Sequence, residues 1–296
     1  MTTQTALLLL TTETPLHAGT GQSVAGIDLP IQREIHTNWP CVYGSAVKGA
    51  LRARAFHEQM RLEDLIDLFG PDHAAAAGER DSSHAGALMI GDAHLLALPV
   101  RSLQSCFKWV TCPAALRRFL RDTERLGLAL QAPQIPAIEA LTALGGQDQV
   151  LFLEEFRLQL QRSEQVEQLA ALLAPLSGGA LSVEDLQQRL VIVHDDIFSF
   201  LASNATAVNA HIAIDAQTKT VKDGALWYEE SLPPESLLYV PLSATASRRK
   251  GSGLTSAEVL GLFAGLFPAD RNWLQMGGNE TTGMGWCRVG INPAQA

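Results

Sequence analysis

The sequence predicts an α+β protein in which strands and helices interleave without a regular βαβ rhythm. Segments with the two-residue period of half-buried strands are spread along the whole chain, and segments with the helical period lie between some of them. With 47% hydrophobic and 18% charged residues, the 296-residue chain can bury a substantial core. This interleaving suits a split-βαβ, ferredoxin-like sheet better than a doubly wound one. We expect a single domain over residues 1–296.

Local signals assign the elements in order. Ser45 is a residue type that commonly caps helices, and Pro113 favours the first helical turn, so helices are expected to begin there. The expected helices span residues 45–61, 113–126, 163–176, 183–190 and 256–267. The expected strands span residues 5–11, 149–160, 190–195, 237–244 and 283–291, with a strand–turn–strand unit at 86–98.

Three segments depart from this regular pattern. Residues 13–42 are rich in glycine and proline, which predicts a long structured loop, and loops of this length are usually functional or disordered. Residues 208–230 alternate apolar and polar side chains on both sides of a polar centre, which predicts a protruding β-hairpin. A mobile insertion is expected at about 70–86, where an alanine run lies next to Gly78 and Ser82.

Composition excludes several classes of protein. No apolar run approaches the roughly 18 residues that a membrane span needs, and "ALLLL" at 6–10 lacks the flanks of a signal peptide. The four cysteines fit neither a metal-binding spacing nor a dense disulfide framework, so we expect buried free thiols and a cytoplasmic protein. The net charge of −9 argues against a uniformly basic surface, yet residues 31–61 carry five basic residues against two acidic ones. Such a local patch is what phosphate binding uses.

The stretch "YGSAVKGALRAR" at 43–54 is a candidate phosphate site. Lys48 and Arg52 are one helical turn apart near the positive end of the expected helix, and Gly49 would let a phosphate backbone come close. The stretch lacks the spacing of a nucleotide P-loop. A solvated basic helix face explains the helix alone equally well.

The tail "MGGNETTGMGWCRV" at 276–289 is dense in glycine. Glycines at this density indicate a backbone that lies against a ligand or another chain, and a plain hairpin turn is the alternative.

The stretch "GIDLPIQREIHTNWP" at 26–40 holds a single carboxylate, Asp28, in an irregular segment. Leu29 precedes Pro30 and is therefore restricted to extended backbone, and the flanking apolar residues can seat the loop on the core. Asp28 is either an ordinary turn residue or the residue that the loop exists to hold in place.

Taken together, these motifs resemble the RAMP proteins of CRISPR systems. The resemblance rests on "TPLHAGTG", "IDLPIQRE", "GSAVKGALR", "DGALWYEESLPPESLLY" and "GGNETTGMGWCRV", and it spans residues 5–290. Within the superfamily, "IDLPIQRE" and "LWYEESLPPE" are similar to the fourth-subunit family of type III-B (Cmr) complexes, which forms the repeating backbone. The stretches at 72–86 and 130–150 carry no motif that matches.

The resemblance implies an RNA-recognition-like core with a thumb hairpin, here at about 205–228. Copies would stack head to tail into an open helical filament with other Cmr subunits, on a guide (CRISPR) RNA that pairs with target RNA. The positions that match the family's guide-binding motifs are Ser45, Lys48, Arg52, Gly283, Met284 and Gly285. The family's target-cleaving aspartate matches Asp28.

One carboxylate is sufficient for this chemistry, because RNA carries its own nucleophile, the 2′-hydroxyl. The protein needs to splay the strand so that this oxygen lines up with the phosphorus, and the carboxylate can hold a divalent ion or take the proton. We therefore expect metal-dependent endoribonuclease activity, with magnesium or manganese held by Asp28. His17, Glu229 and Glu230 are possible secondary catalytic residues. His36 flanks the loop as His17 does and could also act as an acid or base, although lone histidines are more often structural.

Three functions are weighed. The first is an RNA-guided endoribonuclease that cuts target RNA at regular intervals, and the second is a non-catalytic RNA-binding scaffold in which Asp28 only caps a turn. The third is a guide-processing nuclease of the wider RAMP group that relies on histidine chemistry and acts alone on precursor RNA.

Overall fold

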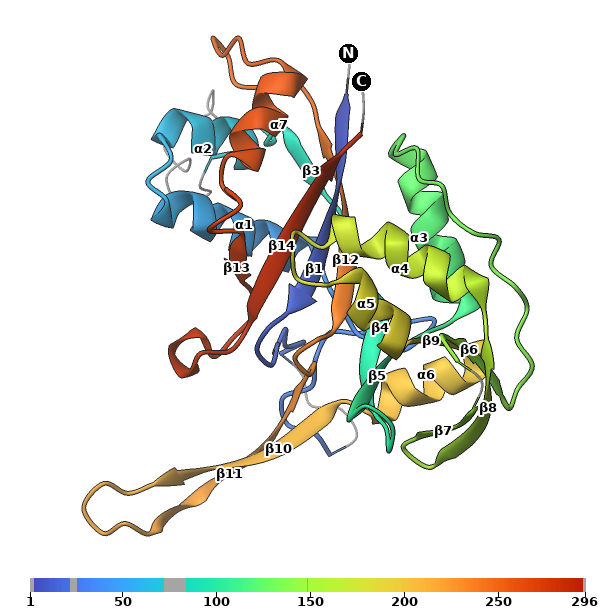
Figure 1. The fold of residues 1–296 in the computed structure, drawn as a ribbon. Helices are drawn as coiled ribbons and strands as arrows, with labels where there is room; N and C mark the ends of the chain where they lie inside the picture. Colours follow the sequence, from blue (N-terminus) through green and yellow to red (C-terminus); the bar gives the residue numbers. More distant parts are fainter. Residues whose placement is uncertain (1–2, 22–25, 72–83, 148, 295–296) are drawn as a thin grey trace.

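The fold is a large mixed sheet with helices on both faces and one projecting hairpin (Figure 1). The computed structural model describes residues 3–21, 26–71, 84–147 and 149–294. The α-helices in these ranges are α1 (Gly44–His57), α2 (Leu62–Phe69), α3 (Pro113–Arg125), α4 (Glu164–Leu176), α5 (Val183–Arg189), α6 (Asp195–Asn204) and α7 (Ser256–Ala264). The first strands are β1 (Gln4–Thr12), β2 (Cys41–Val42), β3 (Leu88–Ile90), β4 (Ala93–Arg101), β5 (Phe107–Thr111), β6 (Thr142–Gly145) and β7 (Gln149–Leu153). The others are β8 (Phe156–Arg162), β9 (Leu190–Val193), β10 (Ala207–Ile214), β11 (Val221–Ser231), β12 (Leu237–Ala244), β13 (Trp273–Gln275) and β14 (Trp286–Pro293).

The ferredoxin-like core is formed by β14, β1, β12 and β4, which neighbour one another in that order and are all antiparallel. Helix α1 follows β1 and α7 follows β12, so each helix connects two parallel strands with a third strand between them. This is the split-βαβ arrangement that the sequence predicted, and the fold class is confirmed.

Strand β1 separates two hydrophobic cores, because alternate side chains of a strand point to opposite faces. Leu8 and Leu10 pack among residues of α1, α2 and α7, whereas Leu7 and Leu9 pack among residues of α3, α4 and α5. The two groups of helices lie on opposite sides of β1 in Figure 1. Burial on both faces explains why "ALLLL" is continuously apolar, as in other fully covered strands.

The structure corrects several sequence-based boundaries. Residues 149–160 form a hairpin of β7 and β8 rather than one strand, because Glu154 takes a left-handed turn (φ 47°) between them. Helix α1 ends at His57 and a separate helix, α2, follows. Ser45 is not the cap: Tyr43 is the N-cap residue, and the N–H of Gly44 donates to Asp92 Oδ1 at 2.6 Å.

Further elements lie outside the sequence-based assignment: β5, β6, β13 and α6. All four cysteines have free thiols, but Cys106 is exposed, contrary to expectation. None of the helices described is long and apolar enough to cross a bilayer. Most of the insertion expected at 70–86 lies outside the described residues, and the single-domain assignment stays a prediction.

The predicted thumb is a two-stranded hairpin, β10 and β11, that projects away from the rest of the molecule (Figure 1). Its distal residues are exposed, whereas Glu229, Glu230 and Ser231 at the end of β11 are buried. The hairpin therefore has a buried root and a solvated tip.

Candidate functional site

Asp28 lies on a loop that is hydrogen-bonded to the root of the thumb. The N–H of Leu29 donates to the carbonyl of Tyr228 at 3.0 Å, and the N–H of Glu230 donates to the carbonyl of Leu29 at 2.9 Å, which forms a short parallel bridge. Asp28 Oδ2 accepts the N–H of Tyr228 at 2.8 Å, and Asp28 is exposed. The loop thus presents one carboxylate to solvent in an orientation set by the thumb backbone.

Glu230, on β11, ties this loop to the residue that precedes β10. Its Oε1 accepts hydrogen bonds from Arg33 and from Thr206 Oγ1, and its Oε2 accepts the N–H of Ile31 at 3.1 Å. Glu230 is 3% exposed and is paired with the Arg33 guanidinium, which also donates to the carbonyl of Ala202 at 2.9 Å. Both carboxylate oxygens are engaged, so this side chain anchors the root rather than presenting a free acid or base.

Glu229 connects the thumb root to the glycine-rich tail. Its Oε1 accepts a hydrogen bond from Asn279 Nδ2 at 2.6 Å, and Glu229 is buried. Asn279 Nδ2 also lies 3.5 Å from the sulfur of Met284. The tail that the motif analysis assigned to RNA therefore contacts the residue beside Tyr228, whose N–H holds Asp28.

Gly283 and Gly285 of the tail differ in how closely other atoms approach them. Both Gly283 and Gly285 have left-handed backbone, with φ of 82° and 85°. A Cβ on Gly285 would lie 2.0 Å from the carbonyl of Met276, whereas a Cβ on Gly283 would meet nothing within 4 Å. Gly285 therefore serves the close approach within the hairpin, and Gly283 borders open space.

His17 is also at this root, but it is buried. Its Nδ1 lies 2.7 Å from the carbonyl of Glu230, and a Cβ on Gly19 would lie 2.8 Å from its Nε2. The structure thus brings His17, Asp28, Glu229 and Glu230 together, with only Asp28 exposed. His36 has a different setting, with its Nε2 4.0 Å from Glu34 Oε2.

Helix α1 begins beside the same loop. Gln32 Oε1 accepts the N–H of Tyr43 at 2.6 Å, which links the loop to the start of the helix. Ser45 is exposed, Lys48 is half-buried, and Arg52 donates from Nη1 to the carbonyl of Gly70 at 2.6 Å. Within the described residues Lys48 forms no hydrogen bond or ion pair, whereas the Arg52 guanidinium uses one of its N–H groups in the bond to Gly70. Both cations therefore keep N–H groups that are available to a phosphate.

The residues around Asp28 fit a divalent ion only if RNA supplies most of its ligands. Among the described residues, no group of three or more His, Cys, Asp or Glu side chains is placed to hold a metal. Both oxygens of Glu230 accept hydrogen bonds, whereas Glu229 Oε2 and Asp28 Oδ1 accept none among the described residues. Glu229 is buried and Asp28 is exposed, so Asp28 Oδ1 is the one of these two oxygens that faces solvent. Magnesium sites of this composition, with one carboxylate, substrate phosphates and waters, do occur in proteins.

Sequence reasoning missed two residues of this site, Arg33 and Asn279. Both lie inside the quoted motifs "IDLPIQRE" and "GGNETTG", but nothing in a motif shows which buried acid each one contacts.

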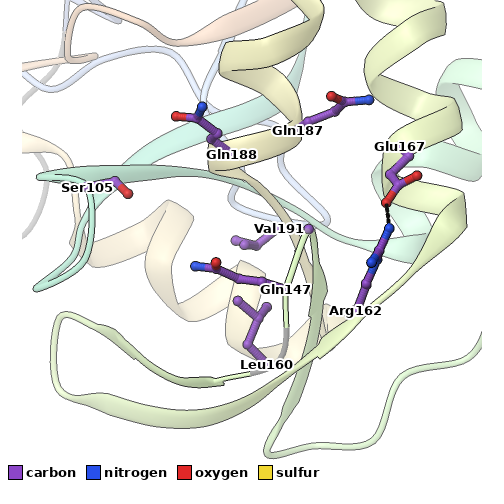
Figure 2. Close-up of a pocket in the computed structure, with 9 residues that line it drawn as sticks. Ser105, Gln147, Leu160, Arg162, Glu167, Gln187, Gln188 and Val191 are labelled. Atoms are coloured by element: carbon purple, nitrogen blue, oxygen red, sulfur yellow. Dashed lines mark hydrogen bonds and ion pairs between the residues drawn. The ribbon is translucent and has the colours of Figure 1, made fainter.

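A cavity of about 650 Å³ lies elsewhere, among β8, β9, α4 and α5 (Figure 2). Amide side chains such as Gln187 and Gln188 line it together with the Arg162–Glu167 ion pair. None of the predicted site residues lines this cavity, so we do not assign it to the site.

The fold and site define a mixed α/β protein with a ferredoxin-like core, a projecting hairpin, and a loop-borne carboxylate clamped at the hairpin root. The chain belongs to the RAMP superfamily, whose family model matches residues 9–288. It is 35% identical over 290 residues to the "CRISPR system Cmr endoribonuclease Cmr4" of Pyrococcus furiosus, covering 96% of this chain and 94% of that protein.

Solved structures agree with this family assignment. Oligomeric Cmr4 from Pyrococcus furiosus matches with a TM-score of 0.73 and 29% identity, covering 99% of each chain. A chain of the type III-B Cmr-beta complex bound to cognate target RNA matches with a TM-score of 0.73 at 21% identity, covering 98% of this chain and 97% of that one. The second likeness concerns the fold alone.

Proposed function

We propose that this chain is the repeating backbone subunit of a type III-B CRISPR effector complex, and that it cleaves target RNA paired to the guide RNA. The observation that carries the proposal is the exposed Asp28 carboxylate, held by the Tyr228 N–H at the root of the thumb. The similarity to a Cmr endoribonuclease along nearly the whole chain supports it.

Placement is the main contribution of the protein to this reaction. A thumb wedged between base pairs would splay the target strand at its root, where Asp28 is presented. The 2′-hydroxyl of the displaced nucleotide can then attack the adjacent phosphorus, with the 5′-oxygen of the next nucleotide leaving. Asp28 takes the proton from the attacking hydroxyl or orients it, and DNA is not cut because it lacks this group.

A divalent ion, magnesium or manganese, would be held by Asp28 together with groups of the bound RNA. When bound, it would neutralise charge that develops on the phosphate oxygens. Asp28 is the protein ligand that we assign to this ion, and substrate and water supply the others.

The guide backbone would lie across α1 and the tail. The Lys48 ammonium group has no partner in the part of the chain that the structure describes, and Gly283 borders open space that a phosphate could occupy. Further copies of the chain would bind head to tail along the guide, with other Cmr subunits, in the cytoplasm. A scaffold without activity is disfavoured by the exposure of Asp28, and a histidine-based guide-processing enzyme by the burial of His17.

Complexes purified from the native host test the proposal. Sequencing of the bound RNA should return short repeat-derived guides. A complementary target should be cut at a regular interval, whereas a target with 2′-deoxy nucleotides at the cut positions should bind and stay intact. Cleavage of the deoxy target, or co-purification of no guide, would contradict the proposal.

A further inference from the structure

A second hollow lies between α1 and the β13–β14 hairpin, on a different face of α1 from Lys48 and Arg52. Its volume is about 230 Å³. Its lining comprises Ala50, Ala53, Arg54, His57, Trp273, Leu274, Gln275, Glu280 and Trp286. The four residues from α1 follow the spacing of one helix face. Two of them are alanines, whose short side chains leave space between the helix and the hairpin.

The opposite wall is aromatic because of the register of the hairpin. Gln275 pairs with Trp286 and Trp273 pairs with Arg288, so these four side chains share one face of the two strands. Trp286 is 38% exposed, a large fraction for an indole, whereas Trp273 is covered on one side by Arg288 at 4.3 Å. The indole of Trp286 is therefore the aromatic surface that remains open to a ligand.

The hollow offers both hydrogen-bond acceptors and donors. Gln275 Nε2 is directed at backbone oxygens of the tail, the nearest being the carbonyl of Met284 at 3.2 Å, while its Oε1 has no partner within the described residues. The exposed Glu280 adds a carboxylate, and Arg54 Nε is a buried donor that also lacks a partner among the described residues. An aromatic wall with both kinds of group at its edge suits a flat heterocyclic ring.

We propose that this hollow binds one unpaired nucleobase, stacked on Trp286. The inference rests on the proposed RNA-binding function and adds a base-binding subsite to it. Ser45 and Gly49 are exposed and lie on the surface of α1 between Lys48 and the hollow. A Cβ on Gly49 would meet nothing within 4 Å. A strand that crosses α1 there contacts Lys48 with a phosphate and places a base against Trp286.

The polar edge can pair with any of the bases. Each nucleobase presents donors and acceptors on its edge, and Gln275 Oε1, Glu280 and Arg54 Nε supply groups of both kinds. Stacking itself is tolerant of sequence, so Trp286 sets the affinity.

The test measures binding of short single-stranded oligo(A), oligo(C) and oligo(U) RNA to the full chain by fluorescence anisotropy at one salt concentration. Trp286→Ala should weaken oligo(A) binding about fivefold or more, the lower end of what one stacked base contributes, and Trp286→Phe should recover most of it. Ala53→Phe fills the hollow from the helix side and should weaken binding equally, which covers the case that Trp286→Ala does not fold. Phe56→Ala is the matched control, because Phe56 is exposed on α1 but does not line the hollow.

The tolerance of sequence has its own measurement. Trp286→Ala should weaken the binding of oligo(C) and oligo(U) as well as that of oligo(A), and Glu280→Gln should raise the affinity for all three RNAs by removing a negative charge. Wild-type affinity in both Trp286→Ala and Ala53→Phe overturns the inference and leaves the proposed function standing. Loss of self-association without loss of RNA affinity also overturns it, since the hollow then receives a side chain of a second copy. Absence of any RNA binding by the full chain contradicts both proposals.

Discussion

Replacement of Asp28 by asparagine isolates the carboxylate from the loop that carries it. The asparagine side chain has the same shape and keeps an oxygen that can accept the Tyr228 N–H, now 2.8 Å from Asp28 Oδ2. The backbone bonds of Leu29 to Tyr228 and Glu230 do not involve the side chain. The variant therefore keeps the loop in place and loses only the charge and the second carboxylate oxygen.

The expected loss of rate follows from these contacts. A positioned acid or base contributes about 10²–10⁴-fold, so single-turnover cleavage by Asp28→Asn complexes should fall by that factor. Target affinity should change little, because Asp28 is one exposed side chain beside a thumb that remains intact. Asp28→Ala removes the bond to Tyr228 as well and should lose at least as much rate.

The assay uses complete complexes with one guide and an end-labelled target, and it follows cleavage and target binding in parallel. Asp270→Asn is the control, because it makes the same chemical change at another exposed aspartate. Mixed complexes should lose only the cuts that face variant copies. Full-rate cleavage by Asp28→Asn would remove Asp28 from the mechanism, and Glu229 would be tested next.

Four further outcomes are expected. Chelation of divalent ions should reproduce the Asp28→Asn defect in the same single-turnover assay, and unchanged cleavage would remove the metal. Lys48→Ala with Arg52→Ala should weaken guide binding for all guide sequences and flatten its salt dependence; a loss confined to some guides would contradict phosphate contacts. Replacing 212–226 by Asn-Gly keeps the thumb root and should retain guide binding while target cleavage falls, and an insoluble product would show that the tip supports the fold. Burial raises the pKa of Glu34, but hydrogen bonds from two neighbours and an arginine charge outweigh it and lower that pKa to about 2. The contribution of the Glu34 carboxylate to the free energy of unfolding is therefore fully present above pH 4.5 and is lost as the pH falls toward 2. The loss of folded protein with falling pH, monitored by circular dichroism, should be less steep in Glu34→Gln.

The sequence was sufficient for features that depend on local patterns. The two-residue alternation at 208–230 and its polar centre predicted the hairpin, because strand pairing across a short turn needs only neighbouring residues. The core strands and most helices followed in the same way from periodicity. A turn inside a periodic segment was not predicted. Apolar and polar residues alternate throughout 149–160, and the turn at Glu154 between β7 and β8 does not interrupt this alternation.

The function of individual acids depended on contacts that no local pattern contains. From the sequence, Asp28 was the candidate catalytic carboxylate through the family resemblance, and Glu229 and Glu230 were secondary candidates because they follow the thumb. The fold brings Arg33 to Glu230 across 197 residues and Asn279 to Glu229 across 50, and each contact buries its acid.

The sequence by itself therefore determined the class of fold, the thumb and the loop that carries Asp28, since these follow from hydrophobic period, turn residues and motif. Only the tertiary structure decided which carboxylate faces solvent. Burial and pairing are properties of segments brought together from distant parts of the chain, and they turn chemically equivalent side chains into anchors or into a free acid.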